Sequence, residues 1–255
     1  MKICFIPKTK LKFSSKILLN STLASCSMLN FDLSLRPIMK YLYAPGCALV
    51  TYKPALADQL KTYIESLYGP MDTLLTCCFN APKLADGTCI ITPCATCALH
   101  YQKLYPNCTV KFFLEELAER ADFPFPNYEG MHMSIQDTCS ARTQPHYLQA
   151  IRTLIQRMNI VLDEPEKSGA KAKCCGQLLY GKVSTEKLHT YIENRANEMP
   201  CKDVIVYCAS CIMSMTVGGK EPRYLLDLLF SHPTNMQGVG VDSWNNRLKE
   251  FRRTH

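Results

Sequence analysis

The sequence predicts an α/β protein that contains two copies of one structural unit, each with a parallel sheet. Three observations support this prediction: cysteines recur in the same order in the two halves of the chain, short apolar segments end at these cysteines, and helical patterns lie between them. Because strands that alternate with helices are joined by crossover connections, they are expected to pair in parallel. The chain has 255 residues, which is long enough for two units that each bury an apolar core.

The repeat is carried by ten of the 15 cysteines. In each half, a single cysteine is followed by two adjacent cysteines and then by a Cys-x-x-Cys pair, which indicates a duplicated unit. The first copy consists of Cys47, Cys77, Cys78, Cys94 and Cys97, and the second consists of Cys139, Cys174, Cys175, Cys208 and Cys211. The cysteines outside the repeat are expected to pack as small apolar side chains; they are Cys4, Cys26, Cys89, Cys108 and Cys201.

The segment 1–38 is expected to be an unpacked basic extension. Residues 1–40 hold seven basic side chains and one acidic side chain, and the first convincing structured segment is 41–47. Met39 is therefore expected to be the natural start of the protein, with residues 1–38 upstream of it. The alternative is a bacterial lipoprotein signal that ends at Cys26, but polar residues interrupt its apolar run.

Four short segments of the body are predicted to be buried strands, because each is apolar, partly β-branched and ends at a cysteine. These segments are residues 72–77, 89–94, 133–139 and 203–208. In parallel α/β sheets, ligands gather beyond the carboxyl ends of the strands. The cysteines at these strand ends are therefore expected to form binding sites.

Helical patterns lie between or after the strands. They cover residues 54–68, 98–104, 112–121, 145–158, 185–199 and 224–230. Pro54 and Pro145 stand where the first turn of a helix tolerates proline, and Ser184 can cap the helix that follows it.

The predicted boundary between the two units is the segment 122–130, which is rich in proline and aromatic residues. The first domain would span residues 39–121 and the second residues 131–235, followed by a C-terminal tail at residues 236–255. The polar segment 163–173 is predicted to form an exposed loop that leads to Cys174.

The composition excludes several classes of function. The net charge is +7, but the chain beyond residue 40 holds 22 basic and 21 acidic side chains, so no nucleic-acid partner is expected. No run of 18 or more apolar residues is present, so no integral membrane segment is expected. The odd number of cysteines and their adjacent and Cys-x-x-Cys pairs favour metal ligation in a reducing cytoplasm over disulfides.

The adjacent pair Cys174-Cys175 indicates the kind of metal centre. Two adjacent cysteines are poorly suited to one small tetrahedral ion, because their side chains tend to diverge, whereas they can bind neighbouring atoms of an iron–sulfur cluster. Five thiolates in one set also exceed the four that a zinc site or an ordinary cubane cluster needs. The alternative from the residues alone is a structural zinc protein that uses the Cys-x-x-Cys pairs.

At this point the pattern resembles the cysteine-rich CCG-domain family, which includes the CCG-domain subunit of heterodisulfide reductase and iron–sulfur subunits of respiratory oxidoreductases. The family motif is a cysteine, about thirty residues, Cys-Cys-Gly, about thirty residues and Cys-x-x-Cys. The stretch from Cys139 to Cys211 matches it fully, and its glycine is expected to let the backbone approach a cluster closely. The first copy departs from the motif, because Phe79 replaces the glycine and only 15 residues separate Cys78 from Cys94.

The resemblance implies that the second set of cysteines binds a noncubane [4Fe–4S] cluster. By analogy, it implies a second iron–sulfur cluster at the first set of cysteines. Three alternatives stay open for that set: a noncubane cluster, a cubane cluster or no cluster. The protein would then be a redox protein similar to the CCG-domain subunit of heterodisulfide reductase that transfers electrons to a disulfide or similar acceptor. The alternative is a non-catalytic electron-transfer subunit of a larger oxidoreductase.

Iron–sulfur or flavin partner subunits are implied as the source of electrons, since the sequence has no dinucleotide fingerprint. Helices that start just beyond Cys97, Cys139 and Cys211 are expected to offset the negative charge of a cluster. Arg142 is a candidate for contact with substrate or cluster, whereas Lys171 and Lys173 are expected to be solvated surface groups. No catalytic residue is predicted.

Overall fold

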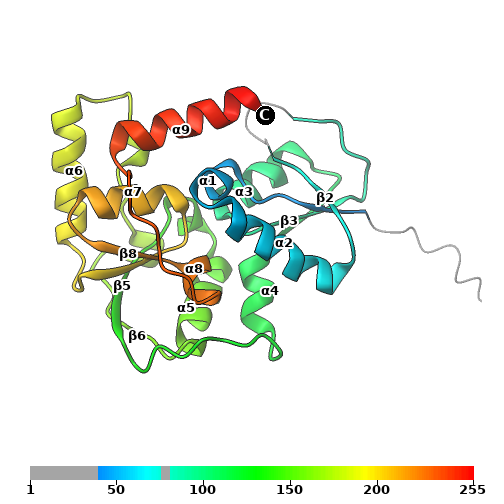
Figure 1. Cartoon of the computed structure of the whole chain (residues 1–255), viewed down its shortest axis with the longest axis horizontal. Helices are drawn as coiled ribbons and strands as arrows, with labels where there is room; N and C mark the ends of the chain where they lie inside the picture. Colours follow the sequence, from blue (N-terminus) through cyan, green and yellow to red (C-terminus); the bar gives the residue numbers. More distant parts are fainter. Residues whose placement is uncertain (1–39, 76–80) are drawn as a thin grey trace, which may run out of the picture. The chain divides into compact units, whose positions relative to one another are not determined.

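The computed structural model describes residues 40–75 and 81–255, and these form an α/β fold with two four-stranded parallel sheets (Figure 1). The predicted fold class is confirmed. The strand order is β2-β1-β3-β4 in the first sheet and β6-β5-β7-β8 in the second. Counted along the chain within each half, the strands have the same spatial order, 2-1-3-4, in both sheets. The two halves therefore share one topology, in agreement with the repeat of the cysteines.

The first half contains four strands, which are β1 (Tyr41–Tyr43), β2 (Asp72–Thr73), β3 (Cys89–Thr92) and β4 (Thr109–Phe112). Its helices are α1 (Cys47–Tyr52), α2 (Pro54–Tyr68), α3 (Ala95–Leu104) and α4 (Phe113–Glu119). All four residues of β3 are buried, as expected for a central strand of a parallel sheet. The predicted bounds of the helix at 54–68 are confirmed, with Pro54 in its first turn.

The second half contains β5 (His132–Gln136), β6 (Val161–Leu162), β7 (Asp203–Val206) and β8 (Glu221–Tyr224). Its α-helices are α5 (Pro145–Arg157), α6 (Thr185–Asn197), α7 (Ala209–Val217), α8 (Leu225–Leu229) and α9 (Val241–Thr254). Three short 3-10 helices complete it: η2 (Cys139–Thr143), η3 (Gly169–Lys171) and η4 (Gln177–Leu179). The side chain of Ser184 accepts a hydrogen bond from the backbone of Lys187, so Ser184 caps α6 as predicted.

Some predicted elements differ from the structure. Of the strand predicted at 72–77, residues 76 and 77 lie outside the described residues, and among residues 72–75 the strand covers Asp72–Thr73. Phe112 ends β4 and does not begin a helix, because its backbone pairs with Thr92 of β3. The predicted tail at 236–255 contains the helix α9, which contacts both α1 and α7 (red in Figure 1).

The contacts between the two halves occur in equivalent pairs. Helix α1 of the first half contacts α7 of the second, and α3 of the first contacts η2 of the second. Both α1 and η2 follow the first strand of their own half, whereas α3 and α7 follow the third. In each contact, the element after the first strand of one half meets the helix after the third strand of the other half. Such reciprocal contacts are typical of an interface between two copies related by an approximate twofold axis.

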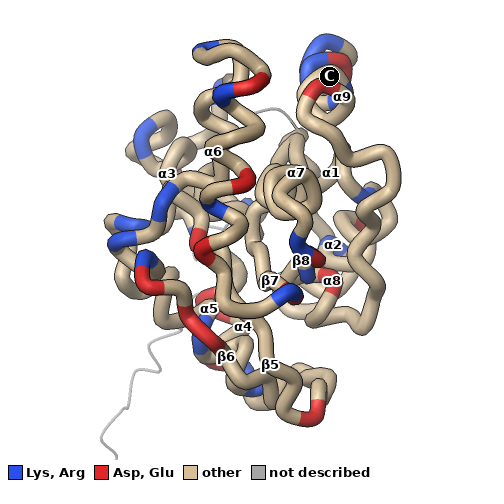
Figure 2. Tube along the Cα trace, turned by 90° about the vertical axis from the view of Figure 1, so that its left-hand side faces the viewer, with Lys and Arg blue, Asp and Glu red and all other residues tan. Residues whose placement is uncertain are grey.

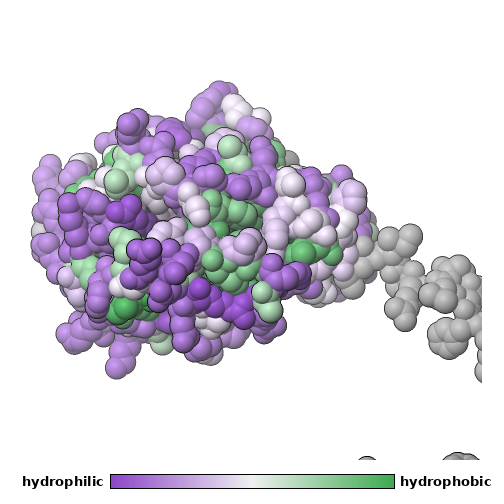
Figure 3. Space-filling model, turned by 60° about the horizontal axis from the view of Figure 1, so that its bottom comes forward, coloured by the Kyte–Doolittle hydropathy of each residue, from purple (hydrophilic) through white to green (hydrophobic). Residues whose placement is uncertain are grey.

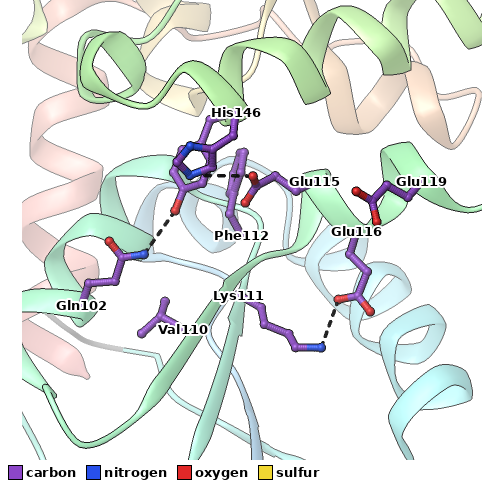
Figure 4. Close-up of a pocket in the computed structure, with 9 residues that line it drawn as sticks. Gln102, Val110, Lys111, Phe112, Glu115, Glu116, Glu119 and His146 are labelled. Carbon is purple, nitrogen blue, oxygen red and sulfur yellow. Dashed lines mark hydrogen bonds and ion pairs between the residues drawn. The ribbon is translucent and has the colours of Figure 1, made fainter.

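Side chains at this interface are paired in the same way. The ring of Tyr52 packs on Tyr224, and the ring of Phe112 packs on Tyr147. The hydroxyl of Tyr52 donates to Asp227 in α8 at 2.6 Å. Glu115 occupies the equivalent position of α4 and faces His146 of α5 at 3.8 Å (Figure 4).

The larger apolar core continues through both halves. It contains Tyr43, Leu60 and Ile91 of the first sheet and its helices, together with Ile135 and Val206 of the second. A smaller cluster around Ile90 and Tyr101 lies in the first half. The expectation of a separate core for each unit is therefore met only in part, because the interface between the halves is itself apolar.

Small apolar areas lie between hydrophilic residues in Figure 3, and acidic and basic residues are interspersed along the chain in Figure 2. The exposed large apolar side chains of the described residues are Met131, Val161, Leu178 and Val183. In residues 40–75 and 81–255, no helix combines the length and apolar character needed to cross a bilayer.

Candidate functional site

The five cysteines of the second repeat lie together beyond the carboxyl end of their sheet. Cys139 follows β5, Cys208 follows β7, Cys211 lies in the first turn of α7, and Cys174-Cys175 lies between η3 and η4. Each of these thiols perturbs the pKa of the next in the order Cys139, Cys174, Cys175, Cys211, Cys208. We call these five residues the second cysteine group.

Strand order explains why these cysteines meet. In the second sheet, β5 and β7 are neighbours, but the chain leaves them toward opposite edges, to β6 and to β8. Such a reversal leaves a crevice at the carboxyl ends of the two strands, where ligands of open α/β sheets bind. Cys139 and Cys208 stand at that point, and the first sheet places Cys47 and Cys94 equivalently after β1 and β3.

The helices at the Cys-x-x-Cys pairs begin earlier than the sequence predicts. Their predicted starts lie beyond Cys97 and Cys211, but α3 begins at Ala95 and α7 at Ala209. The first cysteine of each pair is therefore the N-cap residue, and the second lies in the first turn. Cys94 Sγ accepts a hydrogen bond from the backbone of Cys97 at 3.4 Å, because N-terminal amides of a helix need acceptors. Cys139 itself begins the 3-10 helix η2.

Charge within the second cysteine group is unevenly distributed. Hydrogen bonds from the thiols of Cys139 and Cys175 lower the pKa of Cys174 to about 2, and a hydrogen bond from Cys211 lowers the pKa of Cys208 to about 7. The pKa values of Cys139, Cys175 and Cys211 are raised, chiefly because these thiols donate to their neighbours. Negative charge in the group is therefore favoured at Cys174 and Cys208 and disfavoured at the other three thiols.

Gly176, which completes the Cys-Cys-Gly sequence, packs closely on another helix, while the close approach of its backbone to a cluster stays a prediction. Gly176 has a φ angle of +109°, and a Cβ atom there would lie 2.7 Å from Cγ1 of Ile192 in α6. Its backbone N–H donates to Cys174 Sγ at 3.4 Å. Glycine is thus needed at position 176 for close packing on α6. This packing places the amide of Gly176 next to the sulfur of Cys174.

A buried carboxylate holds the strand ends that carry Cys139 and Cys208. Asp137 is fully buried and accepts hydrogen bonds from both terminal nitrogens of Arg152, at 2.6 and 2.7 Å. It also accepts from the hydroxyl of Tyr207 at 2.8 Å and from the backbone of Gly169 at 2.7 Å. Because Tyr207 directly precedes Cys208, this network joins the ends of β5 and β7 to the loop that leads to Cys174.

A second network supports the Cys174-Cys175 loop from α6. The buried Arg195 donates to the side chain of Gln136 at 2.7 Å and to Glu198 at 2.6 Å. Glu198 also accepts from Lys173, the residue before Cys174. The side chain of Lys173 is 38% exposed, so this lysine is partly solvated and also forms an ion pair. Lys171 is exposed, as predicted.

Arg142 remains a candidate for contact with a bound group. It lies three residues after Cys139, and its Nε is buried without a hydrogen-bond partner among the described residues. A buried guanidinium nitrogen of this kind favours a nearby acceptor or anion.

The first repeat is described only in part. Cys77, Cys78 and Phe79 lie outside the described residues. Cys47, Cys94 and Cys97 lie around Gly46, which has a φ angle of +82° and is followed directly by Cys47. A Cβ atom at Gly46 would lie 3.0 Å from Cys97 Sγ, so glycine lets the Cys47 segment approach the Cys-x-x-Cys turn closely. We call Cys47, Cys94 and Cys97, with Cys77 and Cys78 as predicted members, the first cysteine group.

A cavity of about 140 Å³ connects the two groups. Its sulfur-bearing walls come from both halves, with Cys47, Cys94 and Cys97 of the first group and Cys208 of the second. The aromatic rings of Tyr207 and Tyr224 also line it, together with Arg252. Arg252 donates to the sulfur of Cys47, which lies more than 200 positions earlier in the chain. Because of this separation, the sequence does not indicate that Arg252 belongs to the site.

No three His, Cys, Asp or Glu side chains in residues 40–75 and 81–255 converge on a point where one metal ion would bind. The sulfur atoms of the second cysteine group instead follow one another in a series.

Among the described cysteines outside the repeat, Cys108 packs on the small apolar cluster that includes Cys94 and Cys97, whereas Cys89 and Cys201 have other surroundings. Cys89 is buried in β3, and burial raises its pKa. The thiol of Cys201 donates to Asp163 at 3.1 Å, and Cys108 donates to the backbone of Ala85 at 3.7 Å. Cys4 and Cys26 lie outside the described residues.

A separate cavity of about 470 Å³ lies at the junction of β4, α4 and α5 (Figure 4). No cysteine lines it, and its acidic side chains are Glu115, Glu116 and Glu119. Burial raises the pKa of Glu115, an effect that the nearby His146 opposes. This cavity is independent of the cysteine groups.

Comparison of the chain with protein-family models and with curated proteins gave no match.

Proposed function

We propose that this protein is an iron–sulfur redox protein similar in function to the CCG-domain subunit of heterodisulfide reductase. In this proposal the second cysteine group, Cys139, Cys174, Cys175, Cys208 and Cys211, binds a noncubane [4Fe–4S] cluster. The observation that carries the proposal is the contact among five thiols at the crevice between β5 and β7.

The chemistry of the donor set fits such a cluster. Sulfur is the ligand that iron–sulfur clusters use, and a set of five leaves one more than an ordinary cubane needs. Negative charge is favoured at two of the thiols, and iron would supply the positive charge that the remaining three need. When bound, the cluster would supply one-electron oxidation and reduction.

The chain's own residues would hold and shield that group. Cys175 and Cys211 are 5% and 3% exposed, so the deeper part of the site excludes water. The backbone amide of Gly176 donates to the sulfur of Cys174 at 3.4 Å, and the N-terminal turn of α7 begins at Cys208, so both would offset negative charge.

The first cysteine group, with Cys47, Cys77, Cys78, Cys94 and Cys97, is proposed to bind a second iron–sulfur cluster. The close approach of Cys47 and Cys97 at Gly46 supports this assignment. The cavity that reaches sulfur atoms of both groups supports a position where a disulfide or similar acceptor would meet them. We further propose that iron–sulfur or flavin partner subunits supply the electrons and that the protein works in the reducing cytoplasm.

Anaerobic reconstitution with iron and sulfide tests the proposal. The wild-type protein is expected to turn brown and to bind about four irons per occupied site. The Cys175→Ser variant should lose or convert the cluster of the second group while the protein stays folded. The matched control is Cys201→Ser, because Cys201 also lies in the second half and its thiol donates to Asp163, outside the second cysteine group.

A colourless protein that binds zinc in place of iron would contradict the proposal. Equal iron content together with an unchanged absorption spectrum in Cys175→Ser and Cys201→Ser would contradict the assignment of the second cysteine group. Release of thiols from a disulfide by the reduced protein would separate the redox enzyme from an electron-transfer subunit without a substrate of its own.

A further inference from the structure

We propose that the C-terminal helix α9 is part of the cysteine site, with Arg252 as the positioning residue for the sulfur of Cys47. The role toward a cluster depends on the proposed function, but the contact between Arg252 and Cys47 does not. The helix lies beyond both copies of the repeat in the sequence and would connect the segments that carry the two cysteine groups.

The N-terminal part of α9 contacts the second cysteine group's supporting segments. Trp244 Nε1 donates to the side chain of Ser210 at 3.2 Å, and Ser210 lies inside the Cys208-x-x-Cys211 turn. The side chain of Asn245 accepts from Gln177 at 2.6 Å, two residues after Cys175. This end of the helix is therefore attached to both sequence segments that carry buried sulfur atoms of the second group.

The C-terminal part of α9 contacts the first cysteine group. Arg247 donates to the backbone carbonyl of Thr51 in α1, the helix that begins at Cys47. Arg252 donates to Cys47 Sγ at 3.6 Å. Arg252 lies eight positions after Trp244 in α9. Since a helix rises 1.5 Å per residue, these two side chains start about 12 Å apart along the helix axis. One rigid element therefore connects the two groups.

The sequence of α9 explains why Arg252 points inward. Val241, Trp244 and Leu248 are buried at helical spacing and hold one face of α9 against the protein. Arg252 continues that face four residues after Leu248, so its aliphatic part packs inward with the stripe. Arg253 is one position further around the helix, its side chain is 72% exposed, and it pairs with Glu250.

Charge makes Arg252 suitable for this role. Among the described residues that line the cavity between the groups, Arg252 alone carries a charged nitrogen-containing side chain. A guanidinium offers several donors in fixed geometry, and a hydrogen bond from it favours an anionic sulfur. Arg252 would therefore hold Cys47 in the orientation needed to ligate and would slow the loss of metal from the first group.

Hydrogen exchange of the metal-free protein tests the contact itself. Arg252→Gln should raise exchange in the last turns of α9 and at the start of α1 by about tenfold, the effect of losing one hydrogen bond to a charged group. Arg253→Gln, the matched control on the same helix turn, should exchange like the wild type. Arg252→Lys should lie between the two, because it keeps the charge without the planar donor geometry. Circular dichroism confirms that each variant is folded.

Iron release to a chelator tests the role toward a cluster. Loss of iron from the first cysteine group should be about tenfold faster in Arg252→Gln than in Arg253→Gln, with release from the second group as the internal reference. Identical exchange in the two glutamine variants would overturn the inference, and so would identical iron release. If the wild type takes up no iron, the proposed function fails, and the exchange experiment alone then decides whether Arg252 positions Cys47.

Discussion

Asp137 illustrates how single residues determine the geometry of the candidate site. Its carboxylate is fully buried and satisfied by four hydrogen bonds, two of them from Arg152. The pKa of the neighbouring Tyr207 is raised, chiefly because the phenol itself is desolvated and also because the negative charge of Asp137 lies beside it. The carboxylate thus ties two strand ends together two residues before Cys139.

We expect Asp137→Asn to destabilise the protein by about 3 kcal/mol. Removal of one partner from a buried ion pair leaves the other charge uncompensated, although Arg152 would keep its contact with Glu164. Chemical denaturation of the wild type and variant measures the difference. The control is Asp203→Asn, since Asp203 pairs with Arg223 near the surface and should cost less than about 1 kcal/mol. Equal costs for the two variants would contradict the importance of burial.

At the scale of secondary structure, the last turn of α6 supports the Cys174-Cys175 loop. Arg195 is 1% exposed, whereas Glu198 is 32% exposed and bridges Arg195 to Lys173. Burial raises the pKa of Glu198, but hydrogen bonds from Lys173 and Arg195 lower it more, so the net pKa lies below its ordinary value. This turn therefore contributes stability only while Glu198 is ionised.

The sign of the pH dependence follows from that lowered pKa. The ionised Glu198 stabilises the protein fully above the pKa of glutamate in the unfolded chain, about 4.3. This stabilisation is lost as the pH falls through the lower pKa that Glu198 has in the folded protein. Glu198→Gln should therefore reduce the free energy of unfolding at pH 7 by less than about 1 kcal/mol, because solvent screens the partly exposed pair. The difference from the wild type should shrink below about pH 4.

Denaturation curves from about pH 3 to about pH 7 check this expectation, and Glu193→Gln on the exposed side of the same helix serves as the control. A cost of Glu198→Gln that grows as the pH falls would contradict the role of the ionised carboxylate.

At the scale of the whole molecule, the two halves are copies in topology but share much of their core. The halves meet at the contacts of α1 with α7 and of α3 with η2, and aromatic side chains also pack across the interface, Tyr52 on Tyr224 and Phe112 on Tyr147. The fully buried Asp227 of the second half also depends on Lys53 and Tyr52 of the first. Separation of the halves would expose this apolar surface and leave a buried charge without its partners.

We therefore expect residues 39–255 to unfold in one cooperative transition. The fragments 39–121 and 131–255, produced separately, should lack a cooperative transition of their own. Circular dichroism and calorimetry of the full chain and of both fragments measure this. A fragment that melts sharply by itself would show that the repeat is also a pair of independent folding units.

The sequence determined much of the fold because its signals are local. Alternating apolar segments and helical patterns predicted the α/β class, Pro54 and Ser184 predicted helix starts, and the cysteine order predicted two equivalent units. The position of cysteines directly after strands also predicted that they would gather, since carboxyl ends of parallel strands share one edge. The helix α9 was predicted only as a tail, although the spacing of Val241, Trp244 and Leu248 was present to indicate it.

Only the tertiary structure decided which distant side chains meet. Asp137 with Arg152, Glu198 with Lys173 and Arg252 with Cys47 are pairs whose spacing in the sequence carries no signal. The requirement for glycine at 176 likewise comes from Ile192 on another helix. Such contacts depend on how whole helices and sheets pack, because burial and charge pairing act between surfaces that the chain brings together only after its local elements have formed.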